Sequence, residues 1–418
     1  TSTGRPQNNP NTSYIRRNSS FRTSLSVDAG LTYQKQIDDH GLTFTFFATS
    51  EKYKNEAFAA EKLGATNPDG FVFDLATGTE SVTSGFDYTD TRIGTIGRVQ
   101  YNYKGRYLLS SSIRRDGSSK FRSDNQWGTF PSISGAWNIS DEPFWQSLKR
   151  TVNNFRFRVS NGSVGNDRIR SYSFSPGIVQ DINYVGFDGA NESLNLGSSQ
   201  VNFANELLKW ETTTTSNVGI DLGFFKNKLT IAAEYYYADK KNMLFPVFLP
   251  LSAGGPDNAS VTLNVGNMIN KGAELTIGYR GRTGKVNWRM NGTFSTNENE
   301  ITKIDGDTDF LFTNDFGLVG RAPDQSRVTA LAVGHEAGAF YLWTTNGIID
   351  TEEKLANYQL LDSNAQMGDV MFNDNNPDGV LDDNDRVYSG SGLPKFEIGY
   401  TLNANWKSFD FSMNWYAA

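Results

Sequence analysis

The sequence predicts an all-β fold, an antiparallel transmembrane β-barrel, and three observations support this prediction. Apolar and polar residues alternate at period two over segments of about ten residues, the length that a tilted strand needs to cross a bilayer. Short turns and long connections alternate along the chain, as they do in transmembrane barrels. The apolar rows carry aromatic residues near their ends, where membrane interfaces favour them.

The clearest example is the hairpin formed by residues 395–418. Apolar residues occupy every second position from Phe396 to Trp406, and the alternation restarts after Lys407 and Ser408. Because successive side chains of a strand point to opposite faces, each arm has one apolar face and one polar face. We therefore expect the apolar row to contact lipid and the polar row to face the barrel interior.

The earlier strands are expected from weaker versions of the same alternation, each bounded by a polar turn or loop. They cover residues 24–33, 42–53, 93–103, 106–115, 127–139, 155–160, 210–225, 229–237, 265–280 and 286–301, which with the terminal hairpin makes about twelve strands. One short helix is expected after Ser140, which would cap it, because Phe144, Leu148 and Val152 follow at helical spacing.

The connections predict which strand ends share a rim. Short turns at Lys104-Gly105, Lys226-Asn227, 281–285 and Lys407-Ser408 should lie at one rim. The longer segments should lie at the other; they are residues 54–92, with a turn at 67–70, and residues 116–126, 164–209, 245–264 and 302–394.

Residues 302–394 are expected to form an external loop insertion within a partial barrel domain that covers residues 1–418. Within this insertion, residues 341–349 favour a strand. Residues 351–358 favour a short helix with Asp350 and Glu353 as a capping pair.

The composition fits a barrel wall, which has one apolar face and many turns: the chain has 37% hydrophobic residues, 13% aromatic residues and 40 glycines. The chain has no cysteine, which excludes disulfides and thiolate metal sites. Its net charge of −7 is spread out, which argues against a nucleic-acid partner. Residues 1–19 lack the apolar core of a signal peptide, and the last residues end within a strand pattern, so we expect an internal piece of a longer protein.

A soluble β-sandwich or solenoid would also show alternation, because its apolar rows could face a second sheet instead of lipid. Strand length, one-sided loop lengths and aromatic row ends favour the barrel.

Several motifs resemble one family, the SusC/RagA-type TonB-dependent outer-membrane transporters. They are SSSIRRDGSSKF (110–121), NQWGTFPSISGAWNISDEPFW (125–145), FRFRVSNGSVGN (155–166), LKWETTTTSNVGIDLGFFKNKL (208–229), NVGNMINKGAELTIGY (264–279) and GDVMFNDNNPDGVLDDNDR (368–386). Their order and spacing fit the family over most of the chain.

The resemblance implies part of a 22-strand barrel in the outer membrane of a Gram-negative bacterium, without its plug domain. It also implies import of oligosaccharides, glycans or peptides as nutrients. The implied partners are a SusD-like surface lipoprotein, the TonB complex through the missing N-terminal part, outer-membrane lipid and the substrate. The alternative function is that of a structural or adhesive β-sheet surface protein without transport.

The sharpest local motif is an acidic loop that begins at Asp374. Its oxygen-bearing residues match the order of an EF-hand Ca²⁺ loop; they are Asp374, Asn376, Asp378, Val380 through its carbonyl, Asp382 and Asp385. Two features depart from that loop: position 12 is Asp385 instead of Glu, and position 4 is Pro377, whose φ is fixed. The alternative is a solvated turn rich in Asp and Asn.

Aromatic residues of the external segments are candidates to stack on substrate, or else to pack the loops together. The candidates are Tyr172, Tyr184, Phe187, Tyr341 and Trp343. Charged residues of the polar strand faces should line the interior, namely Arg98, Arg156, Arg158, Glu234 and Arg289. No arrangement of the two histidines, His40 and His335, predicts an enzyme.

Overall fold

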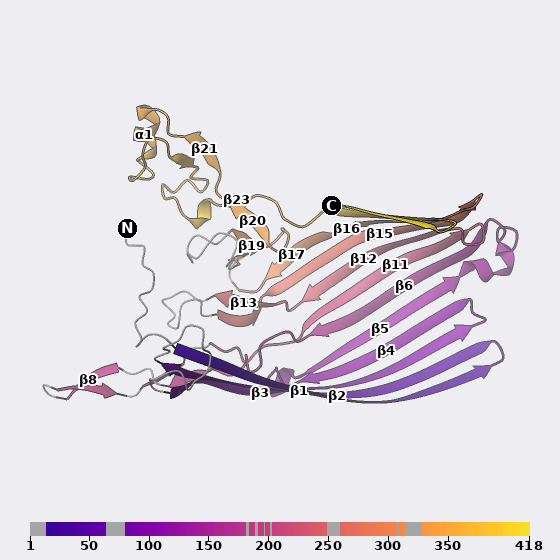
Figure 1. The fold of residues 1–418 in the computed structure, drawn as a ribbon, viewed down its shortest axis with the longest axis horizontal. Helices are drawn as coiled ribbons and strands as arrows, with labels where there is room; N and C mark the ends of the chain where they lie inside the picture. The colour runs from indigo at the N-terminus through magenta and orange to yellow at the C-terminus, as the bar shows by residue number, and fades with distance from the viewer. Residues whose placement is uncertain are drawn as a thin grey trace.

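The computed structural model describes residues 14–63, 80–180, 184–188, 191–195, 197–200, 203–248, 260–306, 309–313 and 328–418. Among these residues the main sheet has thirteen antiparallel strands, which form one broad curved wall (Figure 1). They are β1 (Tyr14–Ile37), β2 (His40–Leu63), β3 (Glu80–Tyr103), β4 (Tyr107–Ser118), β5 (Trp127–Asn138), β6 (Val152–Asn166), β11 (Glu211–Phe224), β12 (Leu229–Lys241), β15 (Gly266–Thr283), β16 (Val286–Thr296), β17 (Glu298–Ile304), β24 (Phe396–Trp406) and β25 (Phe409–Ala417).

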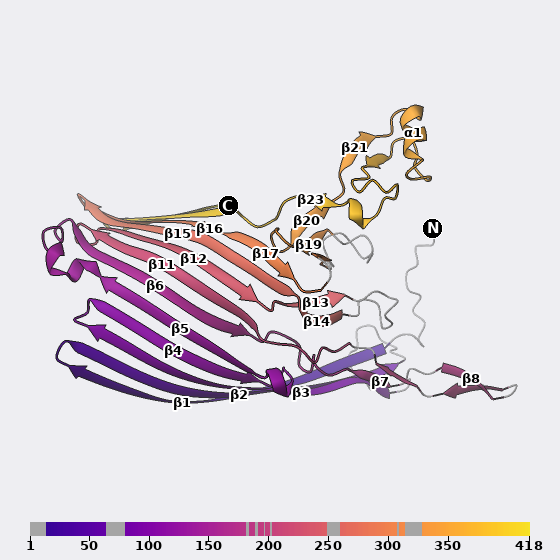
Figure 2. The same cartoon turned by 180° about the vertical axis from the view of Figure 1, so that it is seen from behind.

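Twelve of these strands follow one another across the sheet in chain order, which confirms the predicted antiparallel succession (Figure 2). The thirteenth, β17, continues the line of β16, because both strands pair with β15. The expected strand 286–301 is therefore interrupted once, at Asn297, and extends to Ile304.

The short connections lie together at one rim, as predicted. Neighbouring turns are joined there by backbone hydrogen bonds, from Lys104 N–H to the Asp39 carbonyl and from Arg280 N–H to the Lys228 carbonyl, at 2.9 and 2.8 Å. The last turn, Lys407-Ser408, joins β24 to β25 at the predicted place. We call this edge the short-turn rim and the opposite edge the long-loop rim.

The first three strands are much longer than predicted, at 24 residues each. The expected loop over residues 54–92 is wrong for its described part, because β2 runs on to Leu63 and β3 starts at Glu80; the turn expected at 67–70 lies outside the described residues. Ladder hydrogen bonds require only the backbone, so a strand can continue where neither face is apolar. The extended ends project beyond the rest of the wall (Figure 1).

The helix expected after Ser140 is also wrong. Two 3₁₀ turns, Ile139–Asp141 and Pro143–Trp145, replace it, and neither has a side-chain cap. Pro143 starts the second turn, where its missing N–H costs nothing and its fixed φ suits a helical start. The apolar residues at helical spacing lie in hydrogen-bonded turns that continue to Val152, with bonds from Lys149 N–H to the Trp145 carbonyl and from Val152 N–H to the Leu148 carbonyl, but these turns do not form one continuous helix.

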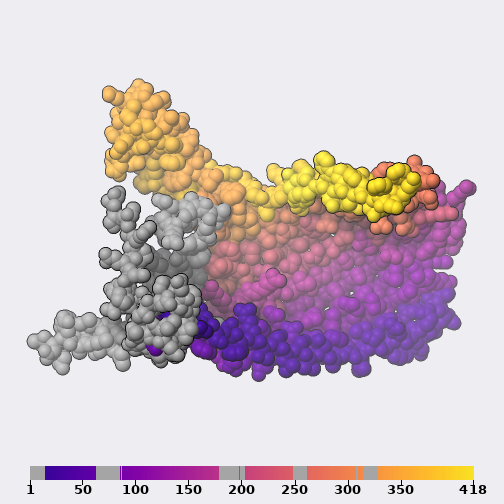
Figure 3. Space-filling model, in the orientation of Figure 1, coloured from indigo at the N-terminus to yellow at the C-terminus, as the bar shows by residue number. Residues whose placement is uncertain are grey.

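Residues 309–394 include a four-stranded sheet of β18 (Phe310–Phe312), β19 (Thr329–Ala332), β20 (Ala339–Leu342) and β23 (Val387–Tyr388). They also contain the pair β21 (Thr345–Ile348) and β22 (Val370–Phe372) and the helix α1 (Glu352–Tyr358). Together they form a lobe that projects from the long-loop rim (Figure 3). The single strand expected over 341–349 is two strands. The cap of α1 is Thr351, whose side chain accepts from Lys354 N–H at 3.2 Å, and not Asp350 with Glu353.

Other short pairs lie near the long-loop rim: β7 (Ile178–Gln180) with β10 (Ser198–Gln200), β8 (Tyr184–Asp188) with β9 (Asn191–Asn195), and β13 (Leu244–Phe248) with β14 (Ser260–Asn264). The apolar core is concentrated at this rim, where it includes the outer ends of β15 and β17. One cluster contains Met243, Val265, Met268, Ile301, Ile304 and Leu331. None of the described helices is long and apolar enough to span a membrane.

Candidate functional site: the polar face and its outer vestibule

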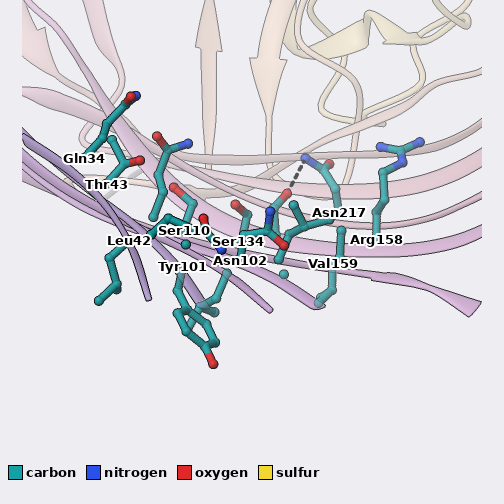
Figure 4. Close-up of a pocket in the computed structure, with 18 of the residues that line it drawn as sticks. Gln34, Leu42, Thr43, Tyr101, Asn102, Ser110, Ser134, Arg158, Val159 and Asn217 are labelled. Atoms are coloured by element: carbon teal, nitrogen blue, oxygen red, sulfur yellow. Dashed lines mark hydrogen bonds between the residues drawn. The ribbon is translucent and has the colours of Figure 1, made fainter. Parts of the chain in front are cut away.

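The wall has one apolar and one polar face, and the cross-strand register keeps each row continuous from strand to strand. Val159 of β6 pairs with Val218 of β11, and their side chains remain 46% and 47% exposed. Leu42, Tyr101 and Val159 point away from the polar face (Figure 4). Exposed apolar rows of this extent need an apolar solvent, which identifies this face as the lipid-facing one.

The polar face of β1–β6 and β11 is hollowed into a cavity of about 810 Å³. Hydroxyl and amide side chains line it, among them Gln34, Thr43, Ser110, Ser134, Ser160 and Asn217 (Figure 4). Two cations, Lys35 and Arg158, also line it, and donors and acceptors of these kinds hydrate a passage. This face is suited to a water-filled interior.

An ion-pair network crosses three adjacent strands on the polar face. Arg158 of β6 donates to both carboxylate oxygens of Asp221 on β11, at 2.9 and 3.1 Å, and to Glu234 on β12 at 3.0 Å. The bidentate geometry orders all three side chains. The sequence had placed Arg158 and Glu234 on this face but could not name their partners.

Near the long-loop rim, hydrogen bonds hold the segment after β6 against the polar face. Asp167 accepts from Arg92 Nε and Nη2 of β3, both at 2.8 Å, and from the hydroxyl of Ser118 at 2.8 Å. Asp167 and Ser118 are only 7% and 2% exposed. Ser171 donates to Asp90 at 2.8 Å four residues later. These contacts hold the segment against the outer ends of β3 and β4.

The anchored segment and the extended strands enclose a second cavity, of about 1140 Å³, which we call the vestibule. Tyr53 and Tyr88 contribute two rings whose centroids are 6.2 Å apart, and Tyr172 lines it from the anchored segment. Charges of both signs, such as Arg170 and Asp87, complete the lining. Sequence reasoning missed Tyr53 and Tyr88, because residue 53 was placed at the end of a spanning strand and residue 88 in a loop.

The structure places two other candidate substrate residues, Tyr341 and Trp343, in the lobe and not in the vestibule. Tyr341 is 8% exposed and packs edge-to-face on Phe310 within the lobe. Trp343 lies edge-to-face on Phe372, with the Arg386 guanidinium 5.5 Å from its ring centroid. Tyr184 and Phe187 belong to β8, and their side chains lie outside the described part of the structure. Of the three predicted residues whose side chains the structure describes, only Tyr172 lines the vestibule.

In the acidic loop, most carboxylate oxygens accept backbone N–H groups. Asp374 Oδ2 accepts from Gly379, whose φ of +83° gives the sharp turn at position 6. Burial tends to raise the pKa of the fully buried Asp385, but N–H groups of Asn376 and Asp382 outweigh it and hold that pKa below its usual value.

Asp374 Oδ1 is buried and has no hydrogen-bond partner within the described residues. In the same part of the chain, no group of three or more His, Cys, Asp or Glu residues is arranged to hold a metal. One unpartnered oxygen at position 1 therefore fits a cation, whereas the other carboxylate oxygens of Asp374, Asp378, Asp382 and Asp385 already accept from backbone N–H groups or from the side-chain amides of Asn376 and Asn384.

A curved antiparallel wall with a lipid-facing apolar side, a polar inner side, short turns at one rim and long loops at the other defines an integral β-barrel protein of the outer-membrane type. The family model described as "TonB dependent receptor-like, beta-barrel" matches residues 1–416. The chain belongs to this family, and it is similar to SusC, a member of the group that its motifs resemble.

Among curated relatives, the chain is 30% identical to TonB-dependent receptor SusC of Bacteroides thetaiotaomicron over 327 residues, covering 78% of this chain and 31% of that protein. It is 29% identical to TonB-dependent receptor P3 of Formosa agariphila, covering 92% of this chain and 37% of that protein. The chain thus spans about a third of the length of these relatives.

Among solved structures, the RagAB peptide transporter superposes with a TM-score of 0.75 at 19% identity. The match covers 96% of this chain and 41% of the other chain, and it supports the fold.

Proposed function

We propose that the chain forms part of the barrel wall of a nutrient importer in the outer membrane of a Gram-negative bacterium, and that the vestibule receives an oligosaccharide or a peptide. Energy would come from the TonB complex, through parts of the protein outside this chain. The observation that carries the proposal is the vestibule, which sits above the polar face at the rim where long loops gather.

The vestibule chemistry suits a solute rich in hydroxyl or amide groups. Tyrosine rings offer apolar faces for sugar rings or side chains, and their hydroxyls offer polar contacts. Asn55 adds a polar group beside them: it is 5% exposed, it donates to the Tyr88 hydroxyl at 3.2 Å, and its Oδ1 has no partner within the described residues. A buried acceptor of this kind is satisfied by a donor from water or from a ligand.

The test is uptake by cells that carry the full-length protein as their only copy, supplied with panels of labelled oligosaccharides and peptides. Replacing Tyr53 and Tyr88 together with alanine should weaken uptake at limiting substrate by roughly 5- to 150-fold, since two aromatic contacts contribute about 1–3 kcal/mol. The control is Tyr279→Ala on the lipid-facing row, which should leave uptake unchanged.

Unaltered uptake in the double variant would remove the vestibule from the route. No uptake of any substrate by the native protein would favour the alternative, a structural or adhesive surface protein.

We also propose that a SusD-like surface lipoprotein covers the long-loop rim of the assembled importer. The relationship to SusC supports this partner. Affinity purification of the full-length protein from its own outer membrane, in mild detergent, should recover one lipoprotein in near-stoichiometric amount. Recovery of the transporter alone, under conditions that keep the barrel folded, would contradict the proposal.

The acidic loop is proposed to bind Ca²⁺, with Asp374 as the first ligand and the loop rearranging so that the other predicted oxygens turn toward the ion. Isothermal titration of the full-length protein with Ca²⁺, compared with an Asp374→Ala/Asp378→Ala double variant, tests this. Heat that only the native protein releases supports binding. The same heat from both proteins, or none from either, leaves a solvated turn.

A further inference from the structure

The connection between β5 and β6, residues 139–151, is longer than the neighbouring turns and carries exposed apolar residues; we call it the rim segment. Figure 2 shows it projecting at the short-turn rim, between β5 and β6. Two of its side chains attach to the lipid-facing row and not to the polar face.

The first attachment is Trp145. Its ring centroid is 5.3 Å from that of Phe155, which belongs to the same alternating row of β6 as Val159. Its indole N–H donates to the Val152 carbonyl at 3.1 Å, which fixes the ring over the start of β6. The chain therefore folds outward over the apolar side of the wall.

The second attachment is Glu142, which is 6% exposed. It accepts from the indole N–H of Trp137 at 3.0 Å and from Arg106 at 3.3 Å. Trp137 in turn stacks on Tyr107, with ring centroids 6.2 Å apart. These rings continue through Tyr103 across the wall, a row like the aromatic girdle that marks the bilayer interface of barrels.

Fixed in this way, the segment leaves two large apolar side chains uncovered. Phe144 and Leu148 are 64% and 50% exposed. Phe225 of the adjacent turn is 56% exposed, and its N–H donates to the Thr151 carbonyl at 3.1 Å, so the apolar patch continues onto the next connection. Water is a poor solvent for such a patch.

Two cations follow directly after Leu148. Lys149 pairs with Asp141 at 3.1 Å, while Arg150 is exposed and has no ion-pair partner within the described residues. Apolar side chains beside an aromatic girdle, followed by cations, are the arrangement by which interfacial segments insert among acyl chains and reach phosphate groups.

We propose that the rim segment is an interfacial anchor, which inserts Phe144 and Leu148 into the phospholipid leaflet at the short-turn rim and presents Lys149 and Arg150 to its phosphates. This inference rests on the proposed placement of the barrel in the outer membrane. Lipid is favoured over a protein partner because both attachments of the segment lie on the lipid-facing row.

The experiment uses the full-length protein in vesicles, with one nitroxide label per variant. This chain has no cysteine, so Phe144→Cys and Leu148→Cys each provide a single attachment site within it once any cysteine elsewhere is removed. The ratio of collisions with oxygen to collisions with a water-soluble nickel complex reports immersion in lipid. Ile133→Cys, on the lipid-facing row, is the immersed control, and Lys285→Cys, in another turn of the same rim, is the aqueous control.

Ratios at positions 144 and 148 several times that at 285 are expected. Ratios equal to that at 285, with a high ratio at 133, would overturn the anchor and leave the proposed function intact. A low ratio at 133 as well would overturn the membrane placement itself.

A charge variant tests the phosphate contact. Lys149→Gln with Arg150→Gln should lower the ratio at position 148 in vesicles that contain phosphatidylglycerol. The same ratio with and without the two cations would refute that part of the proposal.

Discussion

An arginine at Ile133 would place a charge near the middle of the bilayer. On the lipid-facing row of β5, Trp127 and Trp137 are separated by ten positions. At about 3.3 Å per residue and a tilt of about 40°, they lie roughly 25 Å apart along the membrane normal, the height of the apolar band of outer-membrane barrels. Ile133 lies four positions from Trp137 and is therefore close to the midplane of this band. Its side chain is 53% exposed.

Ile133→Arg should therefore cost about 2–4 kcal/mol of folding free energy, the cost of arginine at the midplane of a barrel. The matched control is Ser134→Arg, one residue along the same strand, whose side chain lines the polar cavity. Its cost should be far smaller, because the charge stays hydrated. The measurement is urea unfolding of the full-length protein in lipid vesicles, followed by gel mobility without heating.

Equal losses for the two variants would refute the assignment of faces. They would indicate that both rows are covered by protein, as in a β-sandwich.

Two further changes test the packing at each rim. A Cβ at Gly165 would lie 2.1 Å from Cζ of Phe130, so Gly165→Ala should cost about 1–3 kcal/mol in the same unfolding assay. Gly97→Ala, whose Cβ would meet nothing within 4 Å, should be nearly neutral, and similar losses from both would contradict this packing. At the other rim, hydrogen bonding from the Tyr107 hydroxyl is the main cause that lowers the pKa of Glu142. Because the pKa of Glu142 is lower in the folded state than in the unfolded state, the ionised carboxylate stabilises the protein at pH values above the unfolded-state pKa of about 4.3. This stabilisation is lost as the pH falls through the folded-state pKa. Glu142→Gln should therefore reduce stability at pH 7 and make little difference near pH 3, whereas a loss that is independent of pH would contradict the linkage.

The membrane-spanning part of the fold was predictable because its signal is local. In the terminal hairpin, the polarity of each residue from Phe396 to Trp406 indicates which face of the sheet its side chain occupies. The predicted arms agree with β24 and β25. Lipid on one side and water on the other impose period two wherever a strand crosses. The same reasoning predicted the short turns and the polar placement of Arg158.

The outer part was not predictable, because its signal is not periodic. In β2 beyond Tyr53, Lys54 forms an ion pair with Glu56 in place of an apolar contact. The sequence there resembles a loop, although β2 continues to pair with β3. The anchoring of the segment after β6 depends on Arg92 and Asp167, which are 75 positions apart. Nothing near either residue indicates the other. For the same reason, the sequence placed Tyr172 among the candidates but missed the two tyrosines opposite it.

The long strands also explain why the vestibule lies outside the membrane. At about 3.3 Å per residue and a tilt of about 40°, 24 residues rise roughly 60 Å, more than twice the apolar band of about 25 Å. The short-turn ends of β1–β3 lie at the rim, so most of the excess height stands above the long-loop side. A wall that tall gives the segment from Asp167 to Tyr172 a surface to bind, and the vestibule lies between them. The proposed substrate contacts would then lie apart from the lipid-facing rows. The periodic signal of the family is therefore carried by the spanning strands, whereas the vestibule is built from residues such as Arg92 and Asp167 that meet only in the folded chain.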